Sequence, residues 1–456
     1  SDPLSGMLLG GGDFDPLGVM GGGAALAVAA PPAPVPPTES KQSSTSSSSS
    51  SNGVKAALGN AGASGNDGFA KRWNEFTNDV LLHYNIAGKF RVKANFMTEV
   101  DDREQQAGGK KLPTDKAKAR LEKLEATKEQ EAASVEVTQK EYVRRIETLH
   151  RELSDSWKRA ERVQSLKIAI QCAKLLQDTS VIAFYPSAFV MLTNILDTFG
   201  KLVYERILVR AQELAKRSGS GPIVDGAFSS ADIPQPAKET CRNWFYKTAC
   251  IRELVPRLYI EMALMKCYSF LEDGVFRRVV TRSSGIIRGI GDTLVAGWTR
   301  VYLSKVAAQL LPGHKAHLPA LVQDYLFTWQ QVQSSGDGKG DGGDDGNDDG
   351  KGDGSDTVPP EHAKLLKNRG VSQAEYTRLH RPAFKWLARE LGSQADKDDF
   401  KAALKCYRDF CGDGVALKAI LDGFDPQHWA KSAKGVMQLI KDASVSDVTL
   451  TDLVGS

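Results

Sequence analysis

Apolar residues between positions 139 and 311 recur every three or four positions, which is the spacing of one buried stripe on an α-helix. A first stripe runs from Val143 to Ile170, and a second helix begins after Tyr185-Pro186 and continues to about residue 216. A short turn at Asp178-Thr179-Ser180 separates them. The buried face of the second helix is formed by Leu192, Ile195, Leu196, Phe199, Leu202, Val203 and Ile207. The pattern predicts a helical hairpin whose best-defined segment holds no nucleophile, metal-ligand set or phosphate loop, which favours a scaffold over an enzyme.

The same periodicity predicts helices along the rest of the body. They span residues 237–254, 258–271, 275–287 and 293–311, and then 361–366, 373–391, 397–410, 415–421 and 426–443. No run of alternating apolar and polar residues predicts a strand. Consecutive antiparallel helices with short connections predict an all-α fold, an α-solenoid of HEAT-like helical hairpins, although no repeat of fixed length is visible.

Composition divides the chain into five segments. Residues 1–70 are rich in Gly, Ala, Pro and Ser, which predicts a disordered tail because such a stretch buries too little apolar surface to offset its ordering entropy. Residues 71–138 are expected to form a partly ordered segment and a charged linker. The N-terminal solenoid covers 139–333, an acidic Gly/Asp-rich disordered insert covers 334–358, and further, truncated solenoid helices cover 359–456.

Two related motifs lie in the tail, Asp2-Pro3-Leu4 and Asp15-Pro16-Leu17. A proline lowers the ordering cost of a short docking peptide, and a neighbouring leucine can fill a pocket. Docking and an accident of low-complexity composition both stay open on the residues alone.

Charge is mild overall and uneven along the chain. The formal net charge is +3, but residues 336–356 carry eight Asp against two Lys. The remainder is therefore modestly basic, which is compatible with an acidic partner or an anionic membrane surface and gives no argument for nucleic acid. No stretch reaches the roughly 18 to 20 apolar residues of a membrane span. The chain starts at Ser1 rather than Met, so a signal peptide is not observable, and a cytosolic protein is expected.

Candidate chemistry is sparse, and no catalytic, metal or cofactor site is expected. The cysteines sit mostly beside apolar neighbours, which predicts free buried thiols, and Cys406 and Cys411 lack the second pair that zinc needs. Asp345 to Asp356 meets a calcium-loop spacing that any Asp/Gly-rich stretch meets by chance. Gly285 to Gly291 lacks the preceding strand of a dinucleotide loop and is read as a turn, with Asp292 or Thr293 capping the next helix.

Two surfaces have a functional alternative. Arg277, Arg278, Arg282 and Arg288 form either a solvated helix face or a surface for an acidic partner or lipid headgroups. In Ile251 to Glu261, a proline inside a helical pattern costs roughly 3 kcal/mol, which calls for compensation. The adjacent arginine and tyrosine are residue types enriched at binding hot spots, and core packing is the alternative.

Four segments of the chain resemble a known protein family. IQCAKLLQDTSVIAFYPSAFV, LDTFGKLVYER, AKETCRNWFYKTACIRELVPRLYIE and IRGIGDTLV resemble, in order, the vacuolar protein sorting 35-like large subunit of the retriever complex, part of the Commander assembly on endosomes. The resemblance is strong over 139–333 and weak over 359–456. Since that family's chain is about twice as long, we expect this sequence to represent its N-terminal half, or a truncated gene model.

The resemblance implies a non-enzymatic scaffold of endosomal cargo recycling, cytoplasmic and peripheral on endosomes. Its N-terminal solenoid would dock an arrestin-like, vacuolar protein sorting 26-type subunit through Pro256, Arg257, Leu258 and Tyr259. The tail would bind a small phosphoesterase-like, vacuolar protein sorting 29 subunit through Pro3, Leu4, Pro16 and Leu17. Coiled-coil Commander components are the further partners implied. A general helical-repeat adaptor that binds an acidic partner or a membrane surface is the alternative.

Overall fold

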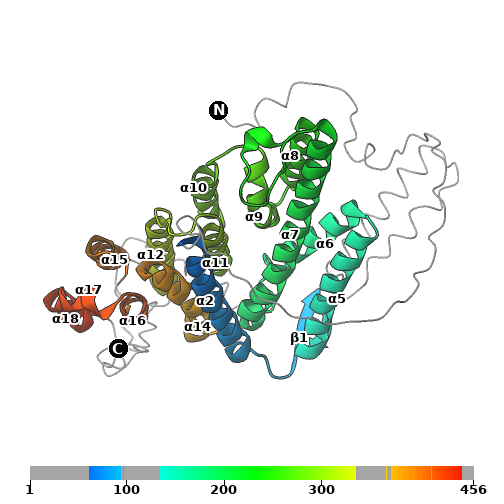
Figure 1. Ribbon diagram of the computed structural model, residues 1–456. Coiled ribbons are helices and arrows are strands. Elements are labelled where there is room, and N and C mark those ends of the chain that lie inside the picture. The colour runs from blue at the N-terminus through cyan, green and yellow to red at the C-terminus, as the bar shows by residue number, and fades with distance from the viewer. Residues whose placement is uncertain are drawn as a thin grey trace, which may run out of the picture. The chain divides into compact units, whose positions relative to one another are not determined.

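The structure is a computed structural model and describes residues 61–93, 96, 134–334, 366, 371–393, 395–411 and 413–443. The predicted all-α fold of helical hairpins is confirmed (Figure 1). The two Asp-Pro-Leu motifs, nearly all of the predicted tail, most of the charged linker, the acidic insert with its calcium-loop spacing and all but one residue of the predicted helix 361–366 lie outside the described residues.

The first hairpin is formed by α5 (Gln139–Lys158) and α6 (Arg162–Leu175), so the single long stripe predicted from Val143 to Ile170 was wrong. The chain turns at Ala160, which adopts a φ of 63°, and the apolar spacing continues across this turn because both helices face the same core. Thr138 and Glu141 form a capping box at the start of α5, which fixes the body's first helix where the pattern placed it.

Helix α7 (Tyr185–Ser218) is the central helix of the N-terminal part. A 3-10 turn, η3 (Ile182–Phe184), leads into it, and Pro186 lies in its first turn, where the missing N–H costs no hydrogen bond. Gly219 ends it with a φ of 70°. By length and composition the segment Ile182–Ser218 could cross a membrane, contrary to the expectation, but 72% of its most apolar window is buried inside the fold. The apolar surface of this segment therefore packs in the core of the fold.

The next helices bring α9 against α6 and α7. The turn η4 (Ser230–Asp232) precedes α8 (Gln235–Ala249), and α9 (Leu254–Ala263) is followed by the 3-10 segment η5 (Met265–Phe270). Then come α10 (Phe276–Ile287) and α11 (Thr293–Leu310). Asp292 caps α11 by accepting from the backbone N–H groups of Leu294 and Val295, as predicted.

The C-terminal part continues the helical hairpins, beginning with a helix that the sequence analysis did not identify, α12 (Leu318–Ser334). It is followed by α14 (Gln373–Gly392), α15 (Lys397–Phe410) and α16 (Gly414–Gly423). The predicted helix 426–443 is two helices, α17 (Pro426–Ala430) and α18 (Ala433–Asp442). Helices α14 and α16 approach so closely that a Cβ on Gly392 would lie 1.9 Å from the Gly423 carbonyl oxygen.

A two-stranded antiparallel sheet corrects the expectation of no strands. Strand β1 (Lys89–Lys93) pairs with β2 (Ser134–Thr138), with Val92 opposite Val135. Each strand is five residues long and its partner lies about forty residues away. A pattern within one short segment is therefore too weak to predict either strand.

Helix α2 (Ala61–His83) begins inside the range predicted as tail and packs against α7, α11 and α14 (Figure 1). The Phe69 and Trp73 rings contact Trp386 of α14 edge-on, at centroid distances of 5.9 and 5.0 Å. Arg72 donates two hydrogen bonds to the Glu390 carboxylate, at 2.9 and 3.2 Å. Segments more than three hundred residues apart in the sequence are thereby joined.

Candidate partner-binding site

Pro256 lies in the first turn of α9, not inside a helix. Helix α9 starts at Leu254, and its first i→i−4 hydrogen bond runs from the Arg257 N–H to the Glu253 carbonyl at 3.2 Å. The opening N–H groups of any helix have no intrahelical acceptor, so a proline at this position loses no bond. The penalty of roughly 3 kcal/mol inferred from the sequence was therefore wrong. The helical pattern of this region is interrupted instead at the end of α8 and at η5.

Leu258 and Tyr259 belong to the core. Their relative exposures are 2% and 0%, and Pro256 is buried as well. The Tyr259 ring lies 5.4 Å from the Tyr302 ring, and its hydroxyl is 3.2 Å from Thr299 Oγ1. Burial raises the pKa of Tyr259 above its ordinary value. The core-packing alternative thus describes these three side chains in the free chain, and they can influence a partner only by fixing the position of α9.

Arg257 is different because its side chain is partly exposed. The two nearest carboxylates on its own segment are engaged elsewhere. Glu253 pairs with Lys174 at 2.6 Å, and Glu261 accepts from Arg282 and from the Tyr268 hydroxyl. No ion pair of Arg257 occurs within the described residues. Leu254, one turn earlier, is also partly exposed. We call Leu254, Arg257 and Glu261 the outer face of α9.

The position of this face depends on one close approach. A Cβ on Gly200 of α7 would lie 2.0 Å from the carbonyl oxygen of Ala263, the last residue of α9. Such a distance is far below any van der Waals contact, so only glycine lets α7 and the end of α9 touch here. Gly200 could not be identified from the sequence, because an isolated glycine in a helical pattern gives no sign of what packs against it.

Most of the arginines between positions 277 and 288 are engaged in ion pairs within the chain. Arg278 pairs with Glu272 at 2.6 Å, Arg282 with Glu261, and Arg288 Nε with Asp324 at 2.8 Å. These pairs neutralise most of the positive charge that was expected to face an acidic partner or lipid headgroups.

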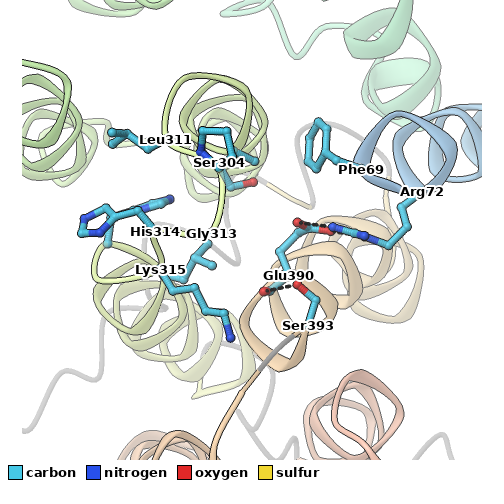
Figure 2. Close-up of a pocket in the computed structure, with 13 residues that line it drawn as sticks. Phe69, Arg72, Ser304, Leu311, Gly313, His314, Lys315, Glu390 and Ser393 are labelled. Carbon is cyan, nitrogen blue, oxygen red and sulfur yellow. Dashed lines mark hydrogen bonds and ion pairs between the residues drawn. The ribbon is translucent and has the colours of Figure 1, made fainter. Parts of the chain in front are cut away.

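Figure 2 shows a small pocket that gathers residue types familiar from active sites. It has a volume of about 90 Å³ and lies between α2, α11, the loop after α11 and α14. Ser304 Oγ donates to the Val301 carbonyl at 2.8 Å and accepts from Trp386 Nε1 at 2.9 Å. Glu390 holds Arg72. The serine and the carboxylate therefore have structural partners: Ser304 joins α11 to α14, and Glu390 joins α14 to α2.

His317 of the same pocket is buried, and neither of its ring nitrogens has a hydrogen-bond partner among the residues that the structure describes. Burial, with a smaller contribution from His314, lowers the pKa of His317 to about 4. The ring is therefore neutral at physiological pH.

The cysteines agree with free thiols in this part of the chain. Cys172, Cys241 and Cys267 are buried, whereas Cys250 is exposed. Burial raises the pKa of Cys172 and of Cys241 to about 12, which keeps both thiols protonated. Among the residues that the structure describes, no three His, Cys, Asp or Glu side chains are grouped so that they could hold a metal ion.

Comparison with known proteins agrees with the resemblance read from the sequence. A sequence profile of the VPS35L family matches residues 72–341. The chain is similar to "VPS35 endosomal protein sorting factor-like" of Dictyostelium discoideum, with 35% identity over 378 residues, covering 81% of this chain and 34% of the relative. The Homo sapiens relative of a similar name is 33% identical over 376 residues, covering 82% of this chain and 35% of the relative.

The Drosophila melanogaster relative is 30% identical over 394 residues, covering 84% of this chain and 38% of its own length. The chain thus spans about a third of the length of the curated relatives it matches, rather than the half that the resemblance implied. Since the profile covers more than half of the chain and starts in α2, the match includes the helix that packs across α14 as well as the outer face of α9. The chain belongs to the VPS35L family.

Proposed function

We propose that this chain acts in endosomal protein sorting, as a non-enzymatic scaffold of a retriever-type cargo-recycling complex that returns proteins from endosomes to the plasma membrane. Membership of the VPS35L family supports the sorting role, because the relatives carry that function in their names. In this proposal the chain is cytoplasmic and reaches the endosome surface through its complex, together with coiled-coil Commander components.

The proposed contact with an arrestin-like, vacuolar protein sorting 26-type subunit is the outer face of α9. The observation that carries it is Arg257, a partly exposed cation whose neighbouring carboxylates are bound to other side chains. A cation of this kind is free to pair with a carboxylate of the partner, and arginine is enriched at binding hot spots. Pro256, Leu258 and Tyr259 have a positioning role in this proposal, since they hold the first turn of α9 in the core.

A second proposed contact involves the tail. Pro3, Leu4, Pro16 and Leu17 would bind the small phosphoesterase-like, vacuolar protein sorting 29 subunit as two short motifs on one tether. Two weak motifs gain affinity when the second engages at the effective concentration set by the tether. Leu4→Ala with Leu17→Ala should abolish binding of the tail peptide, and each substitution alone should only weaken it. Equal affinity of the wild-type and doubly substituted peptides in a calorimetric titration would refute this contact.

The experiment for the scaffold itself is co-purification of the full chain with the arrestin-like subunit. A stoichiometric complex that resists moderate salt is the expected result. If the subunit is not retained and the chain instead binds anionic liposomes with steep salt dependence, the alternative of a membrane-surface adaptor holds. The ion pairs of Arg278, Arg282 and Arg288 argue against that alternative.

A further inference from the structure

Arg300 of α11 is a buried cation that forms no ion pair within the described part of the chain. Its relative exposure is 3%, and its Nε and Nη1 atoms have no hydrogen-bond partner among those residues. Burial lowers the pKa of the Arg300 guanidinium below its ordinary value, although the group stays charged. An uncompensated charge in the interior is costly, and native proteins retain such groups for a reason.

The charges around Arg300 compensate it only in part, because the Asp324 carboxylate raises the pKa of its guanidinium while the neighbouring Arg288 lowers it. The Asp324 carboxylate on α12 accepts from Arg288 Nε at 2.8 Å and forms no ion pair with Arg300. The neighbouring hydroxyls are engaged, because Thr293 Oγ1 is bonded to the Tyr376 hydroxyl at 2.7 Å and Thr328 Oγ1 donates to the Asp324 carbonyl at 2.7 Å. Two arginines therefore face one aspartate, and the charge left over is that of Arg300.

Arg300 lines an open groove with a volume of about 540 Å³. The turn between α10 and α11 forms one side, and α12 and the end of α15 form the other. Phe327 of α12 is 49% exposed, and its ring forms part of an apolar patch in the wall of this groove. The Phe410 ring meets it edge-on, with centroids 6.1 Å apart at an interplanar angle of 87°. Ile290 adds a third apolar side chain.

We propose that this groove binds a peptide segment of a partner protein in which one aspartate or glutamate stands near an aromatic or leucine side chain. The carboxylate would pair with the guanidinium of Arg300, and the apolar side chain would pack against Phe327 and Phe410. A single carboxylate fits better than a phosphate group, because Asp324 in the wall repels a second negative charge. This inference rests on residues distinct from the outer face of α9, so each proposal can fail without the other.

The test is an array of nine-residue peptides probed with the full chain. Each peptide carries one Glu or Asp near a Phe or Leu, and each has a counterpart with Gln or Asn in place of the acid. The best pair is then titrated by fluorescence polarisation against the wild type, Arg300→Met and Phe327→Ser. Arg210→Met, which changes an exposed arginine on α7, is the matched control.

We expect the acidic peptide to bind at least about tenfold more tightly than its amide counterpart, because a charge-assisted hydrogen bond contributes at that level. Arg300→Met should remove this difference, Phe327→Ser should weaken both peptides, and Arg210→Met should change neither. Without peptide, Arg300→Met should raise the thermal midpoint by about 2–4 °C, since it removes an unpaired buried charge.

Two results would overturn the proposal. One is equal binding of acidic and amide peptides to the wild type, or a difference that survives in Arg300→Met. The other is a lower thermal midpoint of Arg300→Met together with tight, Arg300-dependent binding of inorganic phosphate or of phosphatidylserine vesicles. That combination would assign the groove to a phosphate group.

Discussion

Replacing Tyr259 separates a core role from a partner contact. The ring is fully buried against Tyr302, and its hydroxyl is 3.2 Å from Thr299 Oγ1. Truncating a buried aromatic ring to alanine costs about 3–5 kcal/mol, because the cavity collapses only in part. Tyr259→Ala is therefore expected to lower the free energy of unfolding by that amount.

Two companion variants calibrate the measurement. Tyr259→Phe keeps the ring and loses the hydroxyl, which interacts with Thr299 and Tyr185, at a cost of about 0.5–1.5 kcal/mol for each hydrogen bond. The low end is expected, because Thr299 Oγ1 keeps its bond of 2.7 Å to the Val295 carbonyl. Arg257→Glu changes a partly exposed side chain and should stay within about 0.5 kcal/mol of the wild type.

The assay is urea unfolding of the full chain followed by the helical circular dichroism signal. The expected order of midpoints is wild type, Arg257→Glu and Tyr259→Phe close together, with Tyr259→Ala far below them. Wild-type stability of Tyr259→Ala, combined with loss of the arrestin-like subunit, would refute the reasoning. The tyrosine would then contact the partner directly.

Three further predictions concern packing, protonation and thiol access. Gly200→Ala forces a Cβ to within 2.0 Å of the Ala263 carbonyl oxygen and should destabilise the chain by about 1–3 kcal/mol, whereas an alanine at the exposed Gly285, where a Cβ has open space, should cost nothing. Because burial lowers the pKa of His317 to about 4, below the ordinary value near 6.5, the unfolded chain takes up a proton that the folded chain does not. Stability should fall as the pH drops from 6.5 towards 4, by roughly 1.4 kcal/mol at pH 5.5, and His317→Phe should lose this part of the pH dependence. Alkylation of the native chain should label Cys250 well before Cys172, Cys241 and Cys267.

Each of these has a contrary outcome. Equal stability of Gly200→Ala and Gly285→Ala in thermal unfolding would show that α7 and α9 do not touch as described. Parallel curves of stability against pH for the wild type and His317→Phe would mean that this histidine titrates normally in the folded chain. Early labelling of Cys172, read by peptide mass spectrometry, would mean that α6 opens readily.

The sequence predicted the helices best where one face is continuously apolar and a cap or a proline marks the end. Helices α7, α11 and α15 are examples, since Pro186, Asp292 and Asp396 mark their starts. Helix boundaries that depend on tertiary packing could not be predicted from the sequence. The break at Ala160 lies within an unbroken apolar stripe, and α2 has too mixed a composition to show a helical face without its partner α14.

The candidate site shows the same limit. Residue types and the family motif identified Pro256 to Tyr259, but they could not say which side chains face solvent. That depends on α6, α7 and α11, which bury Leu258 and Tyr259 and leave Arg257 partly exposed. Arg300 and Phe327 gave no signal at all, because a single arginine in an apolar helix is informative only once its lack of a partner is visible.

The main proposal is that the outer face of α9 binds an arrestin-like subunit through Arg257. The most direct measurement is calorimetric titration of that subunit into the full chain, comparing the wild type, Arg257→Glu and the matched control Arg210→Glu. We predict that Arg257→Glu weakens binding at least about tenfold with an unchanged thermal midpoint, because the glutamate reverses a charge at the contact. Arg210→Glu should bind like the wild type. Equal affinity of Arg257→Glu and the wild type would rule out Arg257 as the contact.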